Sequence, residues 1–201
     1  MNELLGFDVS KSGKMYDDLS EVFTKTRKQA VNATTEYNAL YGKDEQKRKE
    51  ILQKLLGSVG EDPFFEQDFR CEFGKNIHLG DRFYANFDCI LLDGGEIIIG
   101  NDVLFGPRVG IFTTNHATDS AERKAGGCYS KDVVIKDNVW VGANVTINQG
   151  VTIGENTIIG SGSVVTKSIP ADVIAVGNPC RVLRKITEQD KTGYQSNRHS
   201  N

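Results

Sequence analysis

Apolar residues from Ile77 onward recur in pairs separated by one residue, and the pairs repeat in steps of six. Ile97-x-Ile99-Gly100 and Val151-x-Ile153-Gly154 are two of these units. Two inward residues around one outward residue make a very short strand, and the rest of the unit, often beginning with glycine, makes a turn. The units begin at Ile77, Phe83, Cys89, Ile97, Val103, Val109, Val133, Val139, Val145, Val151, Thr157 and Ser163, with a slip in register near Asp93-Gly94.

This repeat predicts the fold of most of the chain. Three units make one triangular coil of about 18 residues, and stacked coils bury a continuous apolar core. We therefore predict a mainly β protein whose residues 61–185 form a parallel β-helix of hexapeptide repeats. Residues 186–201 are expected to form a short C-terminal helix or tail.

Residues 1–60 have a helical pattern instead. The first helix is expected between Leu19 and Leu40, with these buried candidates: Val22, Phe23, Ala30, Val31 and Tyr37. Gly42 separates it from a second helix that Asp44 could cap. The second helix would bury one apolar face made of Ile51, Leu52, Leu55, Leu56 and Val59. The pattern predicts a small helical segment packed on the larger body.

The repeat is interrupted between Thr114 and Asp132. The insertion, residues 115–132, has no apolar column and contains His116 and the pair Gly126-Gly127. A long irregular loop in a regular solenoid is more often functional than decorative. We expect part of a functional site here.

Composition narrows the function classes. The 201 residues carry 24 Lys and Arg against 27 Asp and Glu, for a net charge of -3, so no broad basic field is available for nucleic acid. No apolar run reaches the ~20 residues of a membrane span, and we see no export signal. The four cysteines, Cys71, Cys89, Cys128 and Cys180, form no C-x-x-C pair. A cytoplasmic location with reduced thiols is expected.

Several segments together resemble the maltose and galactoside O-acetyltransferase family. They are SGKMYDDL, NIHLGDRFYANFDC, TTNHATD, VVIKDNVWVGANVTINQGVTIGENTIIGSGSVVTKSIP and GNPCRVLRKI. The resemblance implies a left-handed coil and a homotrimer with active sites between subunits. It also implies an acetyl-CoA-dependent transfer of acetyl to a sugar hydroxyl, such as that of a galactoside, maltose or glucose-like acceptor, with no metal required. Neither a nucleic acid nor a membrane is implied as a partner.

The resemblance also assigns the residues of the chemistry. The family's catalytic histidine falls at His116, which would act as general base, since a hydroxyl is a poor nucleophile at neutral pH. Asn86 lies beside the acceptor, where its amide could donate to the developing oxyanion. Asp18, Tyr84 and Asp93 are the further candidate ligands of the sugar.

The cofactor groove would follow the later coils. The resemblance places acetyl-CoA along Trp140, Ala143, Ser161, Thr166, Lys167, Arg181 and Arg184. Small residues let the pantetheine arm lie against backbone, and the cationic residues offer charge to its phosphates. A lone prism has flat faces, so we expect the inserted loop to cross to a neighbouring subunit, with His116 of one chain facing the groove of another.

Departures from the family pattern leave the acceptor open. Glu72, Gly94, Gly127 and Cys128 stand where relatives carry other residues on the acceptor side. A nucleotide sugar, amino acid or antibiotic remains an alternative acceptor. Cys128 and Cys180 have no neighbouring base in the sequence and are interpreted as unreactive thiols.

Two other classes of protein remain as alternatives. A γ-type carbonic anhydrase would need three histidine ligands, whereas the body offers only His78 and His116. His78 is interpreted as a surface residue, and His199 lies in a polar tail. A non-catalytic scaffold is the third class.

Overall fold

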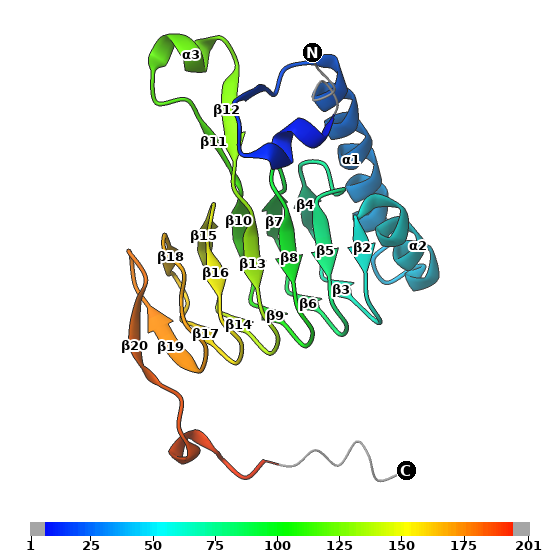
Figure 1. Ribbon diagram of the computed structural model, residues 1–201. Coiled ribbons are helices and arrows are strands. Elements are labelled where there is room, and N and C mark those ends of the chain that lie inside the picture. Colours follow the sequence, from blue (N-terminus) through cyan, green and yellow to red (C-terminus); the bar gives the residue numbers. More distant parts are fainter. Residues whose placement is uncertain (1–6, 195–201) are drawn as a thin grey trace.

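The computed structural model describes residues 7–194, and its main body is a triangular parallel β-helix (Figure 1). The first face contains β2 (Ser58–Val59), β5 (Ile77–Leu79), β8 (Ile97–Ile99), β13 (Val133–Ile135) and β16 (Thr152–Ile153). The second contains β3 (Phe64–Phe65), β6 (Tyr84–Ala85), β9 (Leu104–Phe105), β14 (Trp140–Val141), β17 (Ile158–Ile159), β19 (Val173–Val176) and β20 (Arg181–Lys185). The third contains β4 (Phe69–Cys71), β7 (Cys89–Leu92), β10 (Gly110–Phe112), β15 (Thr146–Asn148) and β18 (Val164–Val165). The predicted β-helix is confirmed.

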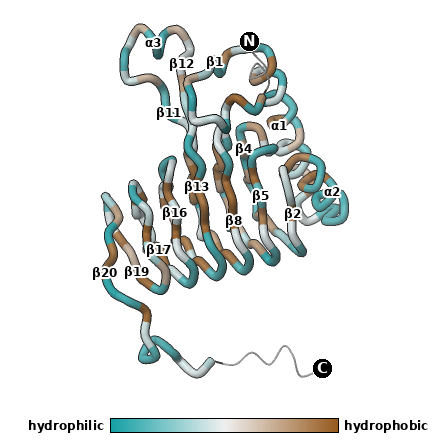
Figure 2. Tube along the Cα trace, in the orientation of Figure 1, coloured by the Kyte–Doolittle hydropathy of each residue, from teal (hydrophilic) through white to brown (hydrophobic). Residues whose placement is uncertain are grey.

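The core is the column of inward residues from each strand. Ile77 lies beside Ile97, and Ile97 beside Val133, in unbroken parallel register across the first face. Figure 2 shows the resulting alternation of hydrophobic and polar positions along the strands. Phe83 and Phe105 fill the centre, with ring centroids 5.1 Å apart.

The glycines that follow the strands serve close packing between coils. A Cβ at Gly142 would lie 2.7 Å from the backbone nitrogen of Ser161 in the next coil. The left-handed backbone conformations at the corners fall mostly to short polar residues, such as Asn138 and Asn144 with φ of 58° and 56°. The repeated glycine is therefore explained by coil spacing more than by backbone conformation.

The N-terminal segment contains α1 (Glu21–Ala39) and α2 (Glu45–Leu55), which cover one end of the β-helix (Figure 1). The cap is confirmed, because the Asp44 side chain accepts a hydrogen bond from the backbone N–H of Lys47 at 2.9 Å. Two expectations were wrong. Val31 is 53% exposed, on the outer side of α1, and Val59 belongs to β2, because the helix ends at Leu55 and the chain enters the first coil.

The insertion is an ordered hairpin rather than an irregular loop. It contains β11 (Thr114–His116), α3 (Ser120–Lys124) and β12 (Gly127–Ser130), and it projects from the prism (Figure 1). Strand β1 (Tyr16–Asp17), which follows the 3-10 helix η1 (Phe7–Ser12), pairs with β12 and completes a three-stranded sheet. The hairpin and the N-terminal segment therefore hold each other in place.

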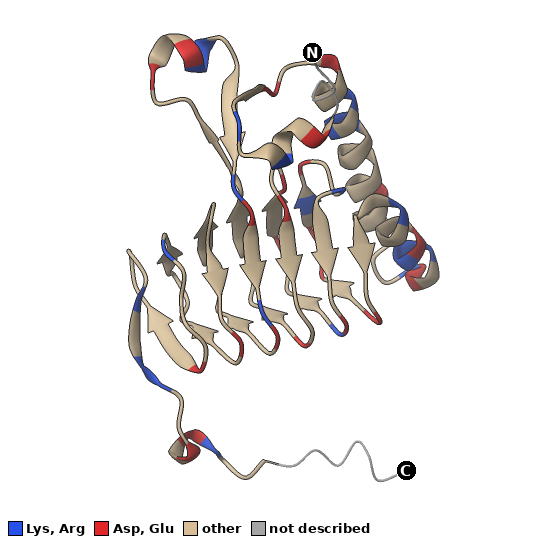
Figure 3. Ribbon diagram, viewed as in Figure 1, with Lys and Arg blue, Asp and Glu red and all other residues tan. Residues whose placement is uncertain are grey.

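The C-terminal segment contains less helix than expected. Strand β20 folds back antiparallel on β19, and one 3-10 turn, η2 (Glu188–Asp190), takes the place of the predicted helix. The rest of the tail, including His199, lies outside the described residues. Figure 3 shows charged side chains gathered on the helices, the turns and β20, while the strands of the first face carry few. Within residues 7–194, no helix has the length and apolar character needed to cross a membrane.

Candidate active site

The predicted site residues lie along two edges of the third face. The asparagine corner, between the second and third faces, contains Asn86, Ala143 and Ser161, each of which follows a strand of the second face. The histidine corner, between the third and first faces, contains Asp93 and Thr166 at strand ends, together with the hairpin that carries His116. One chain therefore divides the predicted site between two edges.

At the asparagine corner, a local hydrogen bond orients Asn86. Its side-chain oxygen accepts the backbone N–H of Phe87 at 2.8 Å. The Nδ2 group donates to no partner among the described residues. An amide fixed in this way can donate to an external oxygen.

Tyr84 lies on the second face, next to Asn86. Its hydroxyl donates to the carboxylate of Glu66 at 3.1 Å, and its ring stacks on Phe64 at 6.3 Å. Burial and the hydrogen bond to Glu66 raise the pKa of the Tyr84 hydroxyl. The contacts with Glu66 and Phe64 hold the Tyr84 ring in place on the second face, two residues before Asn86.

At the histidine corner, the exposed His116 ends β11 and lies opposite Cys128 of β12. Cys128 is fully buried, its thiol lies 3.6 Å from the carbonyl oxygen of Tyr16, and burial raises its pKa to about 11. All four cysteines are buried free thiols. This agrees with the interpretation of Cys128 and Cys180 as unreactive, since the thiolate is the nucleophilic form.

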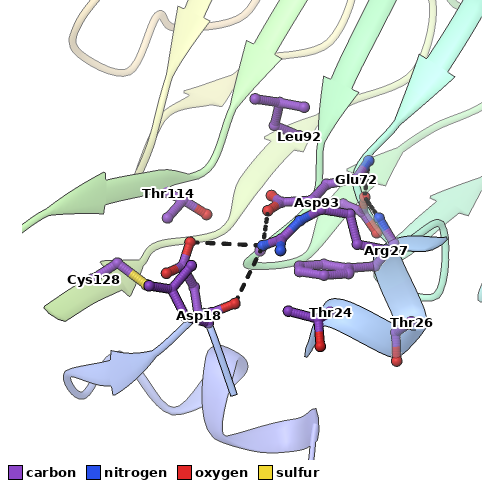
Figure 4. Close-up of polar contacts among 12 residues, drawn as sticks. Asp18, Thr24, Thr26, Arg27, Glu72, Leu92, Asp93, Thr114 and Cys128 are labelled. Carbon is purple, nitrogen blue, oxygen red and sulfur yellow. Dashed lines mark hydrogen bonds and ion pairs between the residues drawn. The ribbon is translucent and has the colours of Figure 1, made fainter. Parts of the chain in front are cut away.

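Strand β1 delivers Asp18 to the histidine corner. The Arg27 guanidinium of α1 lies 3.6 Å from the Asp18 carboxylate and 3.0 Å from that of Glu72, which follows β4 (Figure 4). Glu72 was expected on the acceptor side without an assigned role, and Arg27 was not expected at the site. Arg27 carries no signal of its own, because it is one of several cations in the first half of α1, whereas Glu72 was visible as a departure from the family pattern.

The structure corrects the expectation for Asp93. Its side chain is completely buried, and its carboxylate accepts the backbone N–H groups of Glu72, Phe73 and Asn76 at 3.1, 2.8 and 3.2 Å. These bonds fasten one corner to the next coil. A carboxylate that is buried and satisfied in this way holds the backbone and does not face a sugar.

The predicted cofactor residues are mostly exposed. Trp140 is 52% exposed on β14, and the Ala143 N–H donates to the Ser161 hydroxyl at 3.1 Å. Thr166, Lys167 and Arg181 are exposed, so their hydroxyl and cationic groups fit an anionic phosphate ligand. Arg184 differs, because it forms a two-pronged ion pair with Asp190 at 2.6 and 2.8 Å.

The described residues contain no cluster of side chains suited to bind a metal ion. Among residues 7–194, no group of three or more His, Cys, Asp or Glu is arranged to hold a metal ion. His78 lies on the first face, where its Nδ1 is 2.9 Å from the Ser58 hydroxyl.

Comparisons with known proteins decide the family. A profile for the bacterial transferase hexapeptide (six repeats) matches residues 132–167, and one for the maltose acetyltransferase hexapeptide capping motif matches residues 11–60. The chain is 39% identical to the galactoside O-acetyltransferase of Escherichia coli (strain K12), over 92% of this chain and 91% of that protein. The chain belongs to the maltose and galactoside O-acetyltransferase family.

Solved structures agree with this family assignment. A maltose O-acetyltransferase from Clostridium difficile 630 is 45% identical and superposes with a TM-score of 0.89, over 93% of this chain and all of that one. A hexapeptide-repeat acetyltransferase, VCA0836 from Vibrio cholerae, complexed with acetyl-CoA, is 37% identical with a TM-score of 0.83, over 94% and 100%. The β-helix is left-handed, as the resemblance predicted, because a coil of the opposite hand would not superpose on this family's fold.

A stability measurement tests the role of Asp93. Asp93→Ala should lower the free energy of unfolding by about 3–5 kcal/mol, because three buried N–H groups lose their acceptor. The conservative Asp93→Asn should cost less, since one amide oxygen remains. Urea denaturation of both variants and the wild-type chain measures this. An alanine variant as stable as the wild type would contradict the role.

The pH dependence gives a second readout for Asp93. Burial raises its pKa from 3.8 to about 6, so the folded state holds this proton more tightly than the unfolded chain does. Protonation of Asp93 therefore adds to the free energy of unfolding. This added stability is complete below pH ~4 and is lost as pH rises through ~6, and it amounts to at most about 3 kcal/mol. The wild-type chain should therefore lose stability relative to Asp93→Asn as the pH rises from 3.8 to about 6. A pH-independent difference would show that the carboxyl is not buried.

Proposed function

We propose that this chain is an acetyl-CoA-dependent O-acetyltransferase that acts on a sugar hydroxyl. The names of its relatives support the reaction class, and the acetyl-CoA complex of VCA0836 supports the donor. The observation that carries the proposal is the pair of groups at the two corners, an exposed histidine and a partly exposed amide whose Nδ2 donates to no partner among the described residues. General base and oxyanion donor are what direct acyl transfer needs. A cytoplasmic location is part of the proposal, supported by four buried free thiols.

The mechanism assigns one task to each group. His116 accepts the proton of the acceptor hydroxyl while that oxygen bonds to the thioester carbon. Asn86 Nδ2 donates to the carbonyl oxygen as it becomes an oxyanion. When the carbon–sulfur bond breaks, the imidazolium of His116 returns the proton to the leaving thiolate. Because Cys128 and Cys180 are buried, transfer is direct, without an acyl-enzyme.

The site would be assembled from two chains. Strand β7, four residues long, spans about 13 Å across the third face. Asn86 precedes β7 and His116 lies beyond the end of the neighbouring β10, so the two side chains are still farther apart. Reacting groups must lie about 3 Å from their partners, which one chain does not provide.

Exposed apolar residues support an assembly of several copies. Phe87, Ile90, Leu104 and Trp140 are 45%, 38%, 49% and 52% exposed on the second and third faces and the corner between them. Contiguous apolar surface of this kind typically marks an interface. A closed ring of three chains would bring the histidine corner of each against the asparagine corner of the next, since a head-to-tail interface joins unlike surfaces.

Replacing His116 tests the chemistry. His116→Ala should lower turnover at least ~100-fold and leave acetyl-CoA binding unchanged, since the base acts on the transition state. Thiol release with a panel of sugars measures turnover, and calorimetry measures binding. His78→Ala, which removes the other histidine of the body, is the matched control and should keep its activity. Turnover within threefold of the wild type would contradict the assignment.

Mixing two inactive chains tests the shared site. His116→Ala and Asn86→Ala should each be inactive when expressed alone. Co-expressed in equal amounts, they should recover about a quarter of the wild-type activity, because about a quarter of the interfaces join an intact histidine corner to an intact asparagine corner. Differently tagged chains allow mixed trimers to be purified and counted. Mixed trimers no more active than either parent would place the whole site in one chain.

A further inference from the structure

Glu72 is placed at the acceptor end of the histidine corner. It continues β4, where Cys71 pairs with Leu91, and its side chain points outward in the same row as Leu92 and Phe112. Its side chain is 16% exposed, so the carboxylate is sheltered but keeps some contact with solvent. The hairpin carrying His116 leaves the prism in the second coil after Glu72.

The local charges at this corner do not balance. Arg27 is shared between Glu72 and Asp18, and its guanidinium also lies over the Phe73 ring at 5.3 Å, which fixes it in place (Figure 4). One cation thus faces two carboxylates. Burial raises the pKa of Glu72, while Arg27 and the nearby His116 act to lower it, which places Glu72 within electrostatic range of the proposed base.

Arg70 and Asp93 are the further charged residues around Glu72. Arg70, on the same strand, lines a hollow of the third face together with Asp68 and Asp88. The buried Asp93 adds negative charge behind Glu72. The cluster of Arg27, Asp18 and Glu72 itself has two carboxylates and one cation, which favours a cationic group over an anionic one beside Glu72.

Gly94 supplies no charge here, and a side chain at this position would require neighbouring hydroxyls to move. A Cβ at Gly94 would collide with the Thr114 hydroxyl and would lie 2.7 Å from that of Ser130. Ser130 in turn is 3.0 Å from both the Thr114 and the Tyr16 hydroxyls, so this space is filled by a hydroxyl cluster. The carboxylates of the acceptor end are those of Asp18 and Glu72.

We propose that Glu72 is an acceptor-specificity residue, which selects an acceptor bearing an ammonium group near the acetylated hydroxyl, as in an amino sugar. This inference rests on the proposed function. The ammonium donates to the Glu72 carboxylate, while Arg27 holds that carboxylate in place. An anionic sugar meets two carboxylates and is disfavoured. A charge-assisted hydrogen bond at a half-buried site gives a preference of about tenfold over the neutral hydroxyl.

The test compares glucosamine with glucose, which differ only in an amino group, and with glucuronate as the anion. At pH 6.5 we expect kcat/KM to be highest for glucosamine, about tenfold above glucose, and lowest for glucuronate. Glu72→Gln should bring the ratio of glucosamine to glucose close to one. Glu96→Gln is the matched control, because Glu96, just before β8, is a partly exposed carboxylate that is also paired with one cation, Lys11 of η1. It should keep the wild-type ratio.

Two further readouts separate specificity from structural damage. Glu72→Ser also removes the charge and should lose the preference as Glu72→Gln does, with a melting temperature showing that each variant is folded. The wild-type preference should fall between 20 and 500 mM salt, which screens charge, while the variants should show no such dependence. A structural role for Glu72 would change all acceptors alike.

Failure of this inference differs from failure of the proposed function. If the wild type acetylates glucose and glucosamine equally, or if Glu72→Gln keeps the tenfold ratio, Glu72 does not select for the ammonium group of the acceptor. If no sugar is acetylated, saturation-transfer NMR of the three sugars with the CoA complex still measures the order of binding. Equal or absent binding of glucosamine would then overturn the inference.

Discussion

The six-residue register constrains every other feature of this molecule. Because each coil closes after three short strands, every third turn returns to the same corner, and residues distant in sequence stack there. Coil spacing leaves no room for a Cβ at Gly142, and the buried carboxylate of Asp93 ties one coil to the next through three backbone N–H groups. The faces are rigid, so the chemistry is confined to the edges.

That confinement separates the groups that acyl transfer needs. Asn86 and its free amide donor belong to one edge of the third face, whereas the hairpin places His116 beyond the other edge. The hairpin is not a free loop, because β1 completes its sheet and brings Asp18 with it. The proposed site therefore contains parts of the N-terminal segment, of the insertion and of a second copy of the prism.

The sequence predicted those parts that follow from local periodicity. The hexapeptide units, the Asp44 cap and the interruption before Asp132 could all be seen in the pattern of residues. Val31 and Val59 were misplaced because a short apolar pattern does not show which side of a helix packs, or where a helix yields to a strand. The role of Asp93 and the contacts of Arg27 depend on pairings between distant coils, which no local pattern reveals. The strands of the insertion arise from the pairing of β11 with β12 and of β12 with the distant Tyr16–Asp17.

An experimental structure of the assembled protein with acetyl-CoA tests the shared site most directly. The quantity to measure is the distance from the thioester carbonyl to His116 Nε2 and to Asn86 Nδ2, with each atom assigned to its protomer. The account predicts that the carbonyl lies between a histidine of one protomer and an asparagine of its neighbour, about 3–4 Å from each. Acetyl-CoA bound at one prism, with both groups from the same chain, would contradict it.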